Sequence, residues 1–186
     1  MFYEARELIT AVRHPGSFGG EGATRPRQPG EDESQASYRD SLYVPVERLM
    51  KRSEFWGRFD ASKYRYLALF GLDASKPFDD VRAVRNRIMI SCGMLIRTVG
   101  QEHMEASQGD LRARRERWEE DIGLGASESD DIRDKVDIAV EQIENVCRPA
   151  IFAAVKSRSP RSKLIGIVKL VRRGTPFGRK SKAKQT

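Results

Sequence analysis

The sequence predicts an all-α protein: a bundle of four to five helices with a long flexible loop near the N-terminus and a basic C-terminal extension. Apolar residues return at three- and four-residue steps through most of the chain, which is the helical period. Two-residue alternation is confined to "KLIGIVKLV", whose β-branched residues leave helix and strand both open. A chain of 186 residues suffices for one core with tails.

The first 37 residues divide into a short helix and a loop. Between residues 2 and 13 the apolar side chains have helical spacing, and the helix is expected to end before Pro15. These side chains are Ala5, Leu8, Ile9 and Val12. The segment 15–37 is rich in glycine, proline and polar residues, which bury too little apolar surface to offset the entropy of ordering. We therefore expect an N-terminal helix over 1–14, a flexible loop over 15–37 and a helical core over 38–155.

Residues 38–70 are predicted to form one long helix, or two helices with a bend. The apolar side chains that recur at three- and four-residue steps are Leu42, Val46, Leu49, Trp56, Phe59, Leu67 and Phe70. A start at Pro45 is an alternative, because proline lacks a backbone donor and suits a first helical turn. Gly71 then supplies the stop.

The next helix is predicted to start at Ser75, with Pro77 in its first turn and two aspartates at the positive end of the helix dipole. Its inward positions follow nearly heptad spacing, which places this helix at the centre of the bundle. They are Val81, Val84, Ile88, Ser91, Leu95 and Val99. Gly100 is expected to weaken this helix and Gly109 to end it.

A charged helix, "DLRARRERWEED", is expected next. Opposite charges four residues apart are predicted to pair along it, as Arg112 with Glu116, Arg115 with Glu119 and Arg117 with Asp121. Such pairs indicate a solvated surface. The carboxylate pairs of the chain, Asp79–Asp80, Glu119–Asp121 and Asp130–Asp131, are accounted for by helix capping and solvation.

The last main helix opens around Ser127 and the acidic residues after it, and it is expected to bend at Pro149. Its inward positions are predicted to be Ile132, Val136, Ala139 or Val140, Ile143, Val146 or Cys147, and Ala150.

Charge is distributed unevenly along the chain, whose formal net charge is +7. Residues 156–186 hold eleven lysines and arginines and no acidic residue, which leaves 23 basic and 27 acidic residues, a net charge of −4, in 1–155. The basic character is therefore a property of the C-terminal extension, and the body is mildly acidic.

A reduced, cytoplasmic protein fits the remaining composition. Cys92 and Cys147 lie far apart, outside any CxxC or Cys/His cluster, and both are expected to act as small buried hydrophobes. The N-terminus lacks a basic region followed by an apolar one, so no signal peptide is indicated. No apolar run approaches the roughly 18 residues of a membrane span.

The body from Ser37 to Val155 resembles an uncharacterised family of bacterial all-helical proteins. The stretches that carry the resemblance are "RYLALFGLDASKPFDDVRAVRNRI", "RRERWEED" and "ENVCRPAI". It implies a compact helical bundle, and no function comes with it.

Acid–base chemistry has few candidate side chains in this sequence. The two histidines are His14, at the lip of the flexible loop, and His103. A flexible loop is a poor support for a general base. A di-iron site in a helical bundle uses Glu-x-x-His, but the residue three before His103 is Gly100. The sequence therefore predicts no metal site and no cofactor.

The stretch "RTVGQEH", from Arg97 to His103, is similar to the Arg-x(4 to 6)-His motif of HEPN-type ribonucleases, small helical bundles that typically dimerise. The resemblance implies a metal-independent RNA endonuclease in which His103 is the general base and Arg97 steadies phosphate charge. Six residues of ideal helix turn two side chains about 120° apart, so the pair converges only if Gly100 breaks the helix. The alternative is a surface arginine and histidine at a helix end.

The extension 156–186 combines an apolar stretch with basic residues. As a helix, it would gather Leu164, Ile167, Val168 and Val171 on one side. Three roles fit such a segment: it lies on an anionic membrane, it binds along nucleic-acid phosphates, or it completes the core and solubilises the chain. The candidate anion-binding residues are Lys163, Lys169, Arg172, Arg173, Arg179, Lys180, Lys182 and Lys184.

The function predicted from these observations is non-enzymatic: a helical binding protein whose tail contacts a polyanion, with nucleic acid preferred over membrane. The ribonuclease with Arg97 and His103 is the enzyme alternative. A homodimer or a protein partner also remains open.

Overall fold

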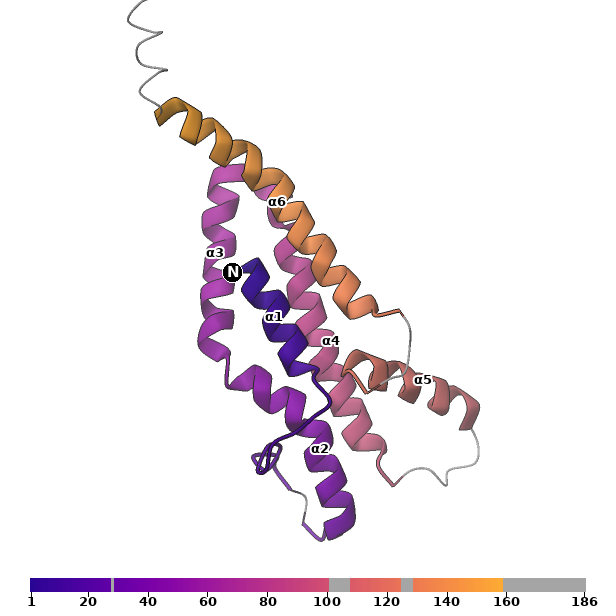
Figure 1. Cartoon of the computed structure of the whole chain (residues 1–186). Coiled ribbons are helices and arrows are strands. Elements are labelled where there is room, and N and C mark those ends of the chain that lie inside the picture. The colour runs from indigo at the N-terminus through magenta and orange to yellow at the C-terminus, as the bar shows by residue number, and fades with distance from the viewer. Residues whose placement is uncertain (28, 101–107, 125–128, 159–186) are drawn as a thin grey trace, which may run out of the picture. The chain divides into compact units, whose positions relative to one another are not determined.

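The computed structural model describes residues 1–27, 29–100, 108–124 and 129–158. Within these ranges the secondary structure is entirely helical, which confirms the all-α prediction (Figure 1). The elements are α1 (Phe2–Val12), α2 (Glu33–Met50), α3 (Ser53–Phe70), the 3-10 helix η1 (Leu72–Ser75), α4 (Lys76–Thr98), α5 (Gln108–Asp121) and α6 (Asp131–Arg158). The chain divides into two units, Met1–Ile143 and Glu144–Thr186, and the boundary falls within α6.

Helix α2 begins at Glu33, neither at residue 38 nor at Pro45 as predicted. Asp32 caps it, because its carboxylate accepts hydrogen bonds from the backbone N–H groups of Ser34 (3.1 Å) and Gln35 (3.2 Å). Pro45 lies inside α2 and is buried, so the helix continues although proline has no backbone N–H to donate.

The segment 38–70 forms two helices, which settles the alternative that the sequence left open. The break falls at Lys51 and Arg52, between α2 and α3. At the other end of α3, Gly71 has a φ of 89°, a left-handed value that glycine adopts without strain. It thereby ends the helix as predicted.

Aromatic rings from three helices form part of the core. The Phe2 ring of α1 lies 5.2 Å from the Phe59 ring of α3 and 4.8 Å from the Phe78 ring of α4, measured between centroids. Helix α4 starts with proline in its first turn, as predicted. All its predicted inward positions are buried, as are Phe78 and Cys92 beside them.

The loop between α1 and α2 makes hydrogen bonds to α2. Arg48 of α2 donates to the carbonyl oxygens of His14 (2.8 Å) and Gly16 (2.6 Å) and to the Glu21 carboxylate (2.6 Å). The Gly22 N–H donates to the buried carboxylate of Glu47 at 2.5 Å. The polar composition of this loop predicts exposure to solvent, but here its backbone and carboxylate groups bind charged side chains of α2.

The end of α4 and the start of α5 also correct the sequence prediction. Helix α4 ends at Thr98, and Gly100 follows with a φ of 84°. Gly109 lies inside α5, so it does not end the preceding helix. Two predicted pairs of α5 are present, Arg112–Glu116 and Arg115–Glu119, each at 3.1 Å. The third is wrong, because Asp121 pairs with Arg87 of α4 at 2.7 Å.

Helix α6 buries Ile132, Val136, Ala139 and Val140 in the first unit, as predicted. In the second unit Val146 is exposed and its predicted alternative, Cys147, is half-buried, whereas Ala150 is exposed although it was predicted to face inward. Pro149 lies inside the helix. Among the described helices, none combines the length and the apolar character that crossing a membrane requires.

Candidate functional site

Arg97 is the predicted functional residue that falls within the described part of the chain. Its side chain is exposed in the last turn of α4. His103 lies outside the described residues. So do the predicted anion-binding residues Lys163, Lys169, Arg172, Arg173, Arg179, Lys180, Lys182 and Lys184.

The backbone changes direction directly after Arg97. Val99 is extended, with a φ of −61° and a ψ of 125°, and Gly100 has a φ of 84°. A Cβ on Gly100 would lie 3.3 Å from the side-chain nitrogen of Gln35. Helix α4 therefore ends at Thr98, one residue after Arg97.

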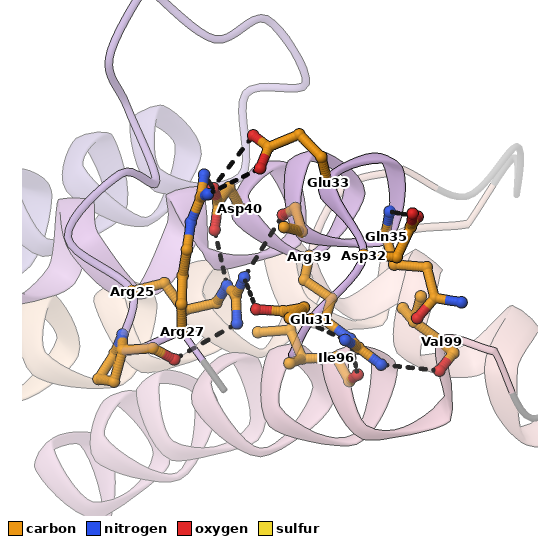
Figure 2. A network of polar contacts seen from close by, with 12 residues as sticks. Arg25, Arg27, Glu31, Asp32, Glu33, Gln35, Arg39, Asp40, Ile96 and Val99 are labelled. Carbon is orange, nitrogen blue, oxygen red and sulfur yellow. Dashed lines mark hydrogen bonds and ion pairs between the residues drawn. The ribbon is translucent and has the colours of Figure 1, made fainter. Parts of the chain in front are cut away.

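The C-terminal end of α4 is held by an arginine from α2 (Figure 2). Arg39 donates to the carbonyl oxygens of Ile96 (3.3 Å) and Val99 (3.1 Å), which have no partner within the helix. A cation at this end is also favourable for the helix dipole. The Glu31 carboxylate, which is 3% exposed, accepts from Arg39 at 2.6 Å.

Arg25 extends this network into the loop before α2 (Figure 2). It donates to Glu31 at 2.9 Å and to Asp40 at 2.7 Å, and its side chain is 5% exposed. Asp40 also accepts from Arg27 at 2.9 Å. Burial opposes the charge of Arg25, but hydrogen bonds to Glu31 and Asp40 outweigh it and raise the pKa of its guanidinium. Each cation thus has a carboxylate partner, so this network joins elements of the fold and is no open anion site.

A second polar cluster joins α1, α5 and α6. Arg13 donates to the backbone oxygens of Glu120 (2.8 Å) and Asp121 (2.9 Å) at the end of α5. It also binds both carboxylate oxygens of Asp130, at 2.8 and 2.7 Å. Asp130 in turn accepts from the N–H of Arg133 at the start of α6. One guanidinium therefore caps one helix and holds the cap of another.

The sequence prediction placed Asp121 on a solvated face, and the structure shows that this prediction is wrong. It is buried, accepts from the Ser91 hydroxyl at 2.6 Å, and pairs with Arg87. Its hydrogen bond raises the pKa of Arg87. The signal in the sequence was Ser91, a polar residue at an inward position, because a buried hydroxyl needs a hydrogen-bond partner. Beside this cluster lies a small cavity of about 180 Å³.

Groups suited to acid–base or nucleophilic chemistry are few in the described residues. His14 is exposed, and its Nδ1 accepts the N–H of Gly16 at 3.1 Å. Burial raises the pKa of the Cys92 thiol to about 12, so it is protonated and unreactive at neutral pH. No group of three or more His, Cys, Asp or Glu side chains in the described ranges is arranged to hold a metal ion.

The C-terminal ends of three helices are capped in the same way, by an arginine from another element, and the sequence did not reveal this. Arg48, Arg39 and Arg13 donate to backbone oxygens at or just beyond the C-terminal ends of α1, α4 and α5. Each also binds a carboxylate from a loop: Glu21, Glu31 and Asp130, respectively. Local sequence shows no sign of these pairs because the partners come from other elements.

Comparison of the chain with models of protein families, with curated proteins and with solved structures found no match.

Proposed function

We propose that the protein is a non-enzymatic helical binding protein in which 1–155 is the scaffold and the basic segment 156–186 contacts a polyanion, with nucleic acid preferred. The observation that carries the proposal is the separation of charge. The segment 156–186 has eleven basic residues and no acidic residue to neutralise them, whereas the body has more acidic than basic residues.

The ion pairs of the body support this assignment. Buried or half-buried arginines such as Arg13, Arg25 and Arg48 are each bound to carboxylates of the same chain. Among the arginines whose side chains the structure describes, six have no ion pair, and they are spread over several elements. These are Arg52, Arg65, Arg85, Arg97, Arg114 and Arg117.

Phosphate contacts by such a segment release counterions, which gives affinity that falls steeply with salt. Phe177 is the single aromatic residue in 156–186, so base stacking contributes little. The binding is therefore expected to be largely independent of nucleic-acid sequence.

The test is binding of fluorescent duplex DNA by the full chain at several salt concentrations. Changing Lys180, Lys182 and Lys184 together to glutamine should weaken binding and reduce the slope of log affinity against log salt by about 2 to 3. The matched control changes Arg112, Arg114 and Arg117 of α5 to glutamine and should leave that slope unchanged. Equal affinity of the tail variant and the wild type would refute the proposal. Binding to anionic vesicles but not to DNA would replace nucleic acid with membrane.

The ribonuclease remains a second candidate because one observation favours it. Arg97 and His103 can converge only if the helix breaks between them, and α4 does end at Thr98. A labelled single-stranded RNA incubated with the full chain and a metal chelator, then run on a denaturing gel, tests this function. Cleavage that disappears in both His103→Ala and Arg97→Ala would establish the nuclease, and intact RNA would exclude it.

A further inference from the structure

The outward face of α3 carries apolar side chains that no other described element of the unit Met1–Ile143 covers. Six exposed residues lie at helical spacing along it: Gly57, Ala61, Tyr64, Arg65, Ala68 and Leu69. Tyr64 is 72% exposed and Leu69 77% exposed. The opposite face of the same helix holds Phe55, Trp56 and Phe59 in the core. A row of exposed apolar side chains along one helix face is where a partner could be bound.

Gly57 and Ala61 form a flat region in the middle of this face. Glycine is a poor residue for a helix interior, and no contact with the described residues requires it at position 57, since an added Cβ would meet none of their atoms within 4 Å. Two small residues one turn apart let a second helix approach closely, because the distance between helix axes depends on the side chains at the contact.

Two residues of opposite charge, Glu54 and Arg65, lie along this side of α3. Glu54 and Arg65 are exposed and have no ion pair among the described residues. They lie on the same edge of α3, about 16 Å apart along the helix at 1.5 Å per residue. A second copy running antiparallel, with the two-fold axis between residues 59 and 60, places the partner's Arg65 beside Glu54 and the partner's Glu54 beside Arg65. The same axis brings Gly57 and Ala61 to the crossing point.

A groove lies beside this edge, between α1 and the start of α3, with a volume of about 380 Å³. Its apolar lining comes from Leu8, Ala11 and Phe55. Its charged residues are Glu4, Glu7, Lys51, Arg52, Glu54 and Arg58. Arg58 is already tied to Glu4 of its own chain at 3.7 Å, and Lys51 to Glu47 at 2.6 Å.

We propose that α3 is the interface of a symmetric homodimer, in which Arg65 and Leu69 of each chain enter the groove between α1 and α3 of the other. Leu69 lies one turn beyond Arg65 on the same edge of α3. In this arrangement it therefore contacts the partner's groove next to the place where Arg65 contacts the partner's Glu54. Such an interface is isologous, with the same contacts made twice. Tyrosine and arginine are residues that often dominate interface energy, which fits the positions of Tyr64 and Arg65. A parallel arrangement would place each residue at the level of its own copy, so Glu54 would not lie beside the partner's Arg65.

Analytical ultracentrifugation of the full chain over a range of concentrations tests the dimer. Wild-type protein should dimerise, and Glu54→Arg or Arg65→Glu should each weaken dimerisation at least about tenfold, because each change opposes like charges at both symmetric contacts. The matched controls are Asp110→Arg and Arg114→Glu, two exposed residues of α5 without ion pairs, and they should dimerise as the wild type does.

Mixing the two interface variants is the sharper measurement. The Glu54→Arg chain and the Arg65→Glu chain have opposite charges at both contacts, so together they should form a heterodimer that is tighter than either variant's homodimer. A Gly57→Leu variant should also be monomeric. The matched control is Gly93→Leu in α4, where an added Cβ likewise meets no atom within 4 Å, and this variant should still dimerise. A wild-type monomer at every concentration would overturn the proposal. A dimer insensitive to both charge reversals, or variants that fail to recombine, would overturn it as well.

Discussion

The polar network before α2 and the helix α5 are both rich in paired charges, but they use them differently. In the network, Arg25 and Glu31 are almost fully buried, and each has more than one charged partner. In α5 the Arg112–Glu116 pair joins two side chains that are 84% and 59% exposed. The first set fixes a loop to two helices, and the second lies along one helix in water. Burial and shared partners, more than the number of charges, decide what an ion pair does for the fold.

Breaking the buried network should give the largest effect. Arg25→Ala leaves the carboxylates of Glu31 and Asp40 buried with less compensation, and it should lower the free energy of unfolding by about 3 to 5 kcal/mol. Urea unfolding followed by circular dichroism measures the change. Arg25→Lys keeps the charge but loses the two-pronged geometry, so it should fall between the wild type and the alanine variant. A loss of less than about 1 kcal/mol for Arg25→Ala would show that the network contributes no more than a surface pair.

A substitution in the loop itself should give the next largest effect. Gly22 has a φ of 85°, and a Cβ there would lie 2.0 Å from the carbonyl oxygen of Asp40. Gly22→Ala should therefore destabilise the protein by about 2 to 3 kcal/mol. Gly20 has a similar φ of 87° but open space around it, so Gly20→Ala should cost about 1 kcal/mol. Equal thermal unfolding of the two variants would mean that the loop is not held against α2.

Acid should weaken the attachment of this loop. The hydrogen bond from Arg48 is the main reason that the pKa of Glu21 falls to about 2, and a hydrogen bond from Lys51 lowers the pKa of Glu47. Because the unfolded chain takes up these protons at a higher pH, the stabilisation is complete above about pH 5 and is lost as the pH falls toward 2. Unfolding midpoints measured across this range should decline less steeply in Arg48→Met. An identical decline would contradict the role of Arg48.

The exposed pair of α5 should give the smallest effect. Arg112→Ala is expected to change the free energy of unfolding by no more than about 0.5 kcal/mol, because water and salt screen a pair of this exposure. The measurement is the same urea titration, repeated at high salt, where the difference should shrink further. A loss as large as that of Arg25→Ala would invalidate the distinction between the two regions.

The predictions that succeeded depend on features local in sequence. The inward positions of α4, from Val81 to Leu95, follow from a spacing that any reader of the chain can count. The stop at Gly71 and the pairs Arg112–Glu116 and Arg115–Glu119 also involve residues at most four positions apart. Such interactions are set by helix geometry, so the sequence is enough to anticipate them.

The predictions that failed concern groups whose partners lie far away along the chain. Asp121 was assigned to solvent because its nearest candidate partner was Arg117, but Arg87 and Ser91 reach it from α4. The hydrogen bonds that Arg48 and Glu47 of α2 make to residues of the loop were likewise not anticipated. Neither partnership leaves a periodic trace in the sequence.

By itself, then, the sequence determined the all-helical class, the central helix and the placement of basic residues in 156–186, because periodicity and charge composition act locally. The tertiary structure decided which charges are buried, which arginines cap the helix ends, and which face of α3 is left uncovered. The reason is physical: the energy of a charge depends on its solvent exposure and on partners brought close by folding, and neither can be read from neighbours in the chain.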